Sequence, residues 1–191
     1  MLDGLLLTLT LLPVYLALRH PYRRLPLQLD TGYYVPNHVV AGHGLACSHG
    51  WHARFAWGSR MLPELFYSII YLLYEGAEYP SKSRLWVSIW NYVTAILVGL
   101  LAWRMLGGGV AGYGLGLLIY ALISSEPHYG TYHENAETFE VPGQVLAVLF
   151  LTIGLDNGSG WWCGGAAMVW TATSFAGNPS ALLGLVVLIL S

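Results

Sequence analysis

The segment Leu85–Met105 is the strongest constraint on how this chain can fold, because it carries no charged side chain before Arg104. Its apolar length matches the roughly 20 residues that a helix needs to cross the hydrocarbon core of a bilayer. Trp86, Trp90 and Trp103 lie near its ends, and tryptophan favours the boundary between lipid and water. The segment is therefore predicted to be a membrane-spanning helix.

Further apolar segments continue the same pattern. The triple glycine at 107–109 and the sequence DNGSG at 156–160 separate neighbouring segments, which predicts a tight turn at each place. Gly112, Gly114 and Gly116 are expected to let two helices approach each other closely. The other predicted spanning helices are Leu5–Leu18, Val110–Ile123, Phe139–Leu155 and Trp161–Ala176.

The composition agrees with a membrane protein. Only 9% of the residues are charged, against about 25% in an ordinary soluble domain. We therefore expect an all-α fold, a polytopic transmembrane helical bundle that forms one domain over residues 1–191. The first span starts almost at the initiator Met and is short, and the last apolar run, Ala181–Leu190, stops before it could cross, so the chain is interpreted as the amino-terminal part of a longer module. A net charge of -2 gives no basic surface for nucleic acid.

Two polar segments interrupt the apolar pattern. The first, Arg19–Arg84, contains the stretch Met61–Tyr74, whose apolar residues recur at helical spacing and predict an amphipathic helix in the membrane interface. The second, Ser124–Glu140, is rich in glutamate, histidine and tyrosine. Because two spanning helices separate them, both segments are predicted on the same face of the membrane. The first segment holds most of the basic residues, which favours a cytoplasmic face, but that rule weakens for long loops and we expect the outer face.

Acidic and basic residues within these segments could act together on a substrate with an anionic headgroup and a lipid tail. A carboxylate such as Asp30 can accept a proton from an acceptor hydroxyl. Arginines such as Arg54 and Arg60 can hold a phosphate by bidentate hydrogen bonds. The other candidate substrate-binding residues are Tyr33, His133, Glu134 and Glu137.

The order of motifs carries a family resemblance. An apolar first helix is followed by LDTGYYVPNHVVAGHG and AWGSRMLPELFYSIIYLLYEG, then by two spans and HENAETFEVPGQVLAVLFL. From Leu5 to about Ala176 this arrangement resembles the amino-terminal portion of a GT-C membrane glycosyltransferase of the mannosyltransferase type. Such enzymes take a sugar from a polyprenyl- or dolichyl-phosphate carrier. The resemblance implies transfer to a hydroxyl of a lipid, glycan or protein acceptor at the outer or lumenal face of a plasma or endoplasmic reticulum membrane.

The resemblance also implies roles for individual residues. Asp30 matches the acidic residue of the first outer loop, which in such enzymes activates the acceptor or helps to position the substrates. The reaction expected on this basis is a direct, inverting displacement with Asp30 as the base. Arg60, at the entry to the interfacial helix, would neutralise the phosphate with help from Arg54. Glu137 matches the acidic residue of the second outer loop, Glu134 is its near neighbour, and both would orient hydroxyl groups.

The chain departs from the family pattern at two places. Many relatives carry a second acidic residue next to the first, whereas Thr31 and Gly32 follow Asp30 here. The segment Thr171–Pro179 lacks the basic residue that relatives often place after the fifth helix. Because family members are also much longer, activity of this chain by itself is not expected.

Structural explanations compete with these catalytic ones. Asp30 before Thr31-Gly32 is suitable turn chemistry, and Glu134 and Glu137 could simply stabilise a helix amino terminus. Several arginines could anchor the chain to lipid headgroups instead of binding substrate. The anchors expected on this basis are Arg19, Arg23, Arg24 and, as an alternative to its phosphate role, Arg60.

A histidine-rich stretch raises a different hypothesis, a metal-binding membrane protein. Imidazole and thiolate ligands together suit zinc or copper, but the spacings fit no tight zinc pattern. No cofactor is therefore assigned, although a divalent metal stays open. A non-catalytic membrane scaffold subunit is the third alternative. The residues concerned are His38, His43, Cys47, His49, His52, His128 and His133.

Overall fold

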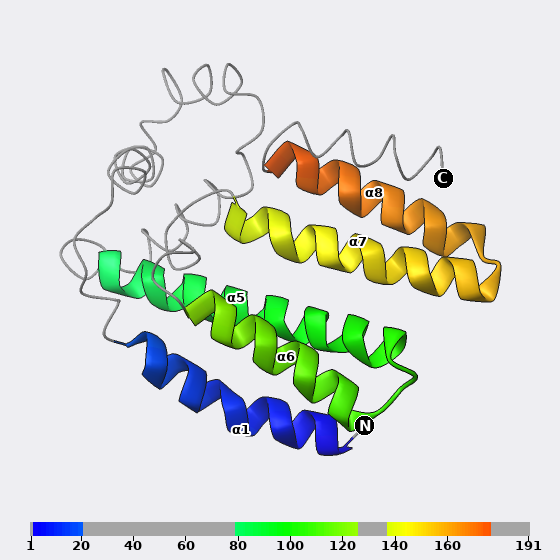
Figure 1. Ribbon diagram of the computed structural model, residues 1–191. Coiled ribbons are helices and arrows are strands. Elements are labelled where there is room, and N and C mark those ends of the chain that lie inside the picture. The colour runs from blue at the N-terminus through cyan, green and yellow to red at the C-terminus, as the bar shows by residue number, and fades with distance from the viewer. Residues whose placement is uncertain (1, 21–78, 126–136, 177–191) are drawn as a thin grey trace, which may run out of the picture.

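The computed structural model describes residues 2–20, 79–125 and 137–176, and every regular element within these ranges is an α-helix. This confirms the all-α prediction for the described residues. The interfacial helix predicted at Met61–Tyr74 and the last apolar run at Ala181–Leu190 lie outside them. In chain order the helices are α1 (Leu2–Arg19), α5 (Tyr79–Met105), α6 (Val110–Ser125), α7 (Glu137–Asn157) and α8 (Gly160–Ala176) (Figure 1).

Two of the described helices are long and apolar enough to cross a membrane. They are α1, over Leu2–Arg19, and the part of α5 over Arg84–Met105. α6 is apolar over Val110–Ser124 but shorter. These helices match the first, second and third predicted spans in position, and their length and composition are compatible with membrane association.

Glycines end α5 and α7 and reverse the chain, close to where the sequence predicts. Gly107 and Gly108 have φ angles of 83° and 80°, a left-handed conformation that costs glycine little, and the Gly108 amide donates to the Trp103 carbonyl at 2.7 Å. The second turn is shorter than predicted. α7 continues through Asn157, so only Gly158, with a φ angle of 60°, and Ser159 separate it from α8.

α5 and α6 pack backbone against backbone, which confirms the predicted role of Gly116. A Cβ atom placed on Gly116 would lie 2.6 Å from the Ala102 Cβ and 2.9 Å from the Val98 carbonyl oxygen. A Cβ on Gly99 would lie 2.9 Å from the Tyr113 ring. Small residues therefore set the distance between these two helices, as they commonly do between helices in membranes.

α7 and α8 pair in the same way. A Cβ on Gly154 would lie 2.6 Å from the Cys163 sulfur, and a Cβ on Gly143 would overlap the Thr173 side chain. Phe150 and Trp162 add an edge-to-face contact, with ring centroids 5.1 Å apart. The described helices thus form two closely packed pairs, and α7 joins them by packing against α5 (Figure 1).

α1 is joined to the α5–α6 pair by hydroxyl groups as well as by apolar contacts. The Thr8 and Tyr113 hydroxyls lie 2.5 Å apart, and the Tyr92 hydroxyl donates to the Thr8 carbonyl at 2.7 Å. The Thr8 hydroxyl also bonds to the Gly4 carbonyl within α1. The core beside these bonds contains Tyr15, Tyr92, Ala95, Tyr113, Leu117 and Ala121.

The described helices expose apolar side chains and bury polar ones. Trp161 and Met168 of α8 are 91% and 75% exposed, and α1 exposes a series of leucines, including Leu2, Leu5 and Leu9. In contrast, Arg19 and Asn91 are buried. A water-soluble domain normally has the opposite distribution, whereas lipid contact favours this one.

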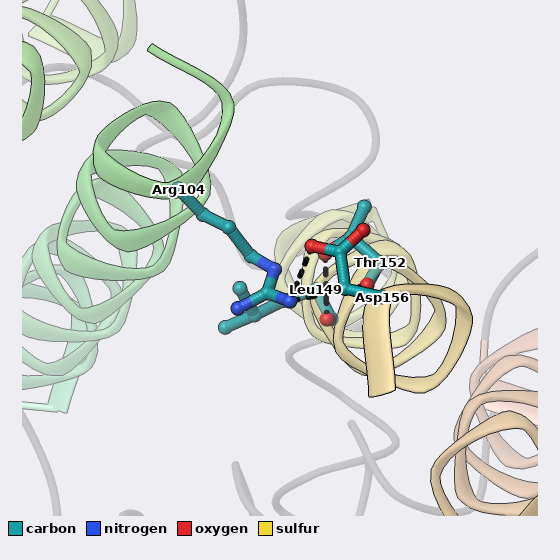
Figure 2. Close-up of polar contacts among 4 residues, drawn as sticks. All are labelled: Arg104, Leu149, Thr152 and Asp156. Atoms are coloured by element: carbon teal, nitrogen blue, oxygen red, sulfur yellow. Dashed lines mark hydrogen bonds and ion pairs between the residues drawn. The ribbon is translucent and has the colours of Figure 1, made fainter. Parts of the chain in front are cut away.

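Arg104 joins α5 to α7 beside the two turns. Its Nη2 atom donates to Asp156 Oδ2 at 2.6 Å and to the Thr152 carbonyl at 3.2 Å (Figure 2). The Thr152 hydroxyl donates in turn to the Leu149 carbonyl. Asp156 is 68% exposed, so solvent and salt weaken the attraction between the two charges.

We expect Arg104→Met to lower the free energy of unfolding by less than about 1 kcal/mol, as for other exposed ion pairs. Asp156→Asn should have a similar effect, and the double variant should cost no more than the sum of the two. Thermal unfolding of the full-length protein in detergent measures all three variants. A loss of about 3 kcal/mol or more, typical of a broken buried pair, would contradict this expectation.

Candidate functional site

The two polar segments join the bundle at one end. α1 and α6 finish there, and α5 and α7 begin there, whereas the two glycine turns lie at the opposite end (Figure 1). We call the first end, which carries Arg19, Arg84 and Ser124, the polar end. The residues between α1 and α5 and those between α6 and α7 therefore both leave and re-enter at the polar end. The sequence predicts that the two polar segments share one face because two spanning helices separate them. The helix ends are arranged as that prediction requires.

Arg19 lies inside the polar end. Its side chain is only 1% exposed, and Nη1 donates to the Tyr15 hydroxyl and to the Ser124 carbonyl, each at 2.7 Å. The Tyr15 hydroxyl lies 3.0 Å from Ser124 Oγ. These three side chains form a hydrogen-bonded cluster, the Arg19 clamp, that joins the carboxyl-terminal ends of α1 and α6.

Aromatic rings enclose the clamp. The Arg19 guanidinium carbon lies 5.4 Å from the centre of the Tyr15 ring, and the Tyr15 and Tyr92 rings are 5.2 Å apart. Burial of a cation in these surroundings is costly unless it is well hydrogen bonded. The prediction that Arg19 anchors α1 to lipid headgroups is therefore wrong, because such an anchor holds its charged group in water.

α5 contributes a second set of buried polar groups at the polar end. Arg84, Ser88 and Asn91 are all buried, and their i, i+4, i+7 spacing places them on one face of the helix. Ser88 Oγ donates to the Arg84 carbonyl at 2.8 Å. Sequence reasoning missed this stripe, although the spacing within an otherwise apolar span could have revealed it.

α7 and α8 add hydroxyl and amide groups at the same end. Gln144 Nε2 donates to Glu140 Oε1 at 2.9 Å, one turn along α7. Thr173 and Ser174 are buried near the end of α8, where their hydroxyls donate to the carbonyls of Val169 and Trp170. The polar end thus combines two buried arginines, a carboxylate and several hydroxyls, which is the kind of chemistry that could border a polar substrate.

Among the predicted site residues, Glu137 alone lies within the part of the chain that the structure describes. Glu137 is the first residue of α7, which places its backbone at the polar end. The other predicted catalytic and substrate-binding residues lie outside the described residues, and so do the histidines and the cysteine of the metal hypothesis. These site residues are Asp30, Tyr33, Arg54, Arg60, His133 and Glu134.

No group of three or more histidine, cysteine, aspartate or glutamate residues that could hold a metal occurs within residues 2–20, 79–125 and 137–176. Cys163 is a free thiol. Towards the glycine turns, α1, α5 and α6 border an apolar groove of about 460 Å³, lined by residues such as Leu5, Leu100 and Trp103. The groove contains no charged side chain that could perform chemistry.

Comparison of the chain with protein-family models, with curated proteins and with solved structures finds no match.

Proposed function

We propose that this protein is a multi-pass membrane glycosyltransferase of the GT-C type. Its membrane placement is supported by the exposed leucines of α1 and by the apolar lengths of α1 and α5. Burial of Arg19 and Arg84 within such helices supports a functional role for the polar end, because charged residues inside membranes are costly and usually serve a function.

The observation that carries the proposal is the contact between the ends of α1 and α6. Because Arg19 Nη1 bonds to the Ser124 carbonyl, the chain leaves α1 and α6 from neighbouring points. Asp30 follows Arg19 by 11 positions, and Glu134 follows Ser124 by 10. Chain segments of this length can reach a shared site beside the bundle, which is what a two-substrate enzyme requires.

The proposed reaction is a direct displacement at the anomeric carbon of a polyprenyl-phosphate sugar. Asp30 accepts the proton of the acceptor hydroxyl as its oxygen attacks that carbon. The bond from the carbon to the phosphate oxygen breaks, and the polyprenyl phosphate leaves. Arg60 and Arg54 stabilise the charge that grows on the phosphate, while Glu134, Glu137, His133 and Tyr33 bind sugar or acceptor hydroxyls.

The proposed function is tested by reconstituting the full-length protein in liposomes with radiolabelled polyprenyl-phosphate mannose and polyprenyl-phosphate glucose. We expect label to move to a lipid, glycan or peptide acceptor, with release of polyprenyl phosphate in equal amount. Release without an acceptor product would indicate hydrolysis only. Neither release nor transfer from any polyprenyl-phosphate sugar would contradict the proposal, and metal analysis of the same preparation would test the metal-binding alternative.

A further inference from the structure

We propose that the apolar groove between α1 and α5 binds one acyl chain of a membrane phospholipid, from the leaflet beside the glycine turns. The groove has a volume of about 460 Å³, and Val110 and Tyr113 of α6 complete its lining. This volume lies within the range of roughly 300–1,000 Å³ that is usual for ligand pockets. The inference rests on the membrane placement within the proposed function and not on the transfer of a sugar.

The groove exists because an aromatic ring keeps α1 away from α5. A Cβ atom placed on Gly4 of α1 would lie 3.7 Å from Tyr113 Cδ1. A Cβ atom placed on Gly99 of α5 would lie 2.9 Å from Tyr113 Cε2, on the opposite edge of the ring. The Tyr113 hydroxyl also lies 2.5 Å from the Thr8 hydroxyl of α1. α1 therefore cannot move inward and close the groove while this ring stays in place.

The walls of the groove suit a hydrocarbon ligand. None of the described residues that line it is charged, and Leu5 and Leu100 provide aliphatic surface from α1 and α5. The Thr8 hydroxyl donates to the Gly4 carbonyl at 2.8 Å and lies beside the Tyr113 hydroxyl, so these polar groups already have partners. Water is not stabilised in such a space, because it finds no hydrogen-bond partners there, whereas apolar molecules do bind.

The groove is continuous with the exposed apolar surface of the helices. Leu5, Leu100 and Trp103 line it and are also exposed, so a lipid chain can enter from the side. Trp103 lies two positions before the end of α5, and tryptophan favours the depth of the lipid headgroups. From Trp103 to Ile96 the helix rises about 10 Å, which is less than half of the roughly 30 Å hydrocarbon core. The donor phosphate is proposed at the polar end, so the lipid beside Trp103 is a phospholipid of the other leaflet.

The inference is tested by thermal unfolding of the delipidated full-length protein, with and without palmitoyl-oleoyl phosphatidylcholine. A steroid-based detergent is used, because its rigid rings cannot replace a flexible chain in the groove. We expect a saturable rise in Tm of about 5–10 °C when the lipid reaches about a hundredfold excess over its Kd. Leu5→Trp should remove most of this rise, because the larger side chain fills the groove. The matched control is Leu9→Trp, since Leu9 is 57% exposed against 55% for Leu5 but does not line the groove.

Native mass spectrometry of the same preparations counts the bound lipid directly. The parent protein and Leu9→Trp should each retain one phosphatidylcholine, and Leu5→Trp should retain none. If Leu5→Trp fails to fold, Leu100→Phe fills the groove from α5 and should show the same loss. Equal lipid responses of Leu5→Trp and Leu9→Trp would overturn the inference. A Tm that rises with polyprenyl phosphate but not with phosphatidylcholine would overturn it as well.

Failure of this inference can be distinguished from failure of the proposed function. Release of the protein from membranes by an alkaline carbonate wash would refute both, because both require membrane placement. Lipid binding by a protein that transfers no sugar would refute the transferase and support the lipid site. Sugar transfer by a protein whose Tm does not respond to phosphatidylcholine would refute the lipid site alone.

Discussion

Asp30→Asn should abolish most sugar transfer by the full-length protein, lowering kcat by about 10²–10⁴-fold. The reason is that the amide keeps the size of the carboxylate but cannot accept the proton of the attacking hydroxyl. The KM for the polyprenyl-phosphate sugar should change little, because the proposed phosphate contacts are made by arginines. Initial rates at several donor concentrations in liposomes separate the two effects.

The matched control for this variant is Asp3→Asn. Asp3 is an exposed carboxylate in the first turn of α1, at the end of the bundle opposite to the polar end. Its replacement should leave the transfer rate unchanged, since no catalytic or substrate-binding role is proposed for it. Unchanged turnover in Asp30→Asn, in a preparation where Asp3→Asn is also active, would remove Asp30 from the mechanism.

The helices of this chain could be predicted from the sequence because their signals are local. Long apolar runs without charge mark α1, α5 and α6, and glycines mark where α5 and α7 end. The helix ends were less predictable. α5 begins at Tyr79, six positions before the predicted span, because hydropathy marks only the apolar part of a helix and the polar residues before it can also be helical.

The burial of Arg19 could not be predicted from the sequence. An arginine that follows an apolar run matches a headgroup anchor just as well, and the residue that determines its position, Ser124, is remote in the chain. The buried stripe of Arg84, Ser88 and Asn91 is easier to predict, since its helical spacing is visible in the sequence. Contacts with another helix determine the burial of Arg19, whereas the periodicity of the α5 sequence indicates the polar stripe.

The catalytic assignments still depend on the sequence and on its family resemblance. Asp30, Arg54 and Arg60 lie outside the described residues, and Glu137 is placed only by the start of α7. The structure contributes the relation between the helix ends from which these segments start. The helix ends from which the two polar segments start lie at the same end of the bundle, which favours a shared site. Helix ends at opposite ends of the bundle would not favour one.

The packing of α5 against α6 leads to the largest expected effect on stability. Alanine normally stabilises a helix relative to glycine, by about 1 kcal/mol. At Gly116 alanine should instead destabilise the protein, because the new Cβ would meet the Ala102 side chain and, 2.9 Å away, the Val98 carbonyl oxygen. A backbone oxygen cannot rotate away as a long side chain can. We expect Gly116→Ala to lower the free energy of unfolding by about 1–3 kcal/mol, and Gly116→Leu to prevent folding of the pair.

The matched control is Gly164→Ala in α8, where an added Cβ would meet nothing within 4 Å. The same chemical change should there be neutral or stabilising, by up to about 1 kcal/mol. Thermal unfolding of both variants of the full-length protein, in one detergent and at one lipid content, compares them directly. Opposite signs support the close contact of α5 and α6, because the chemical change is the same in both variants. A stabilising Gly116→Ala would mean that the two helices lie farther apart than the structure places them.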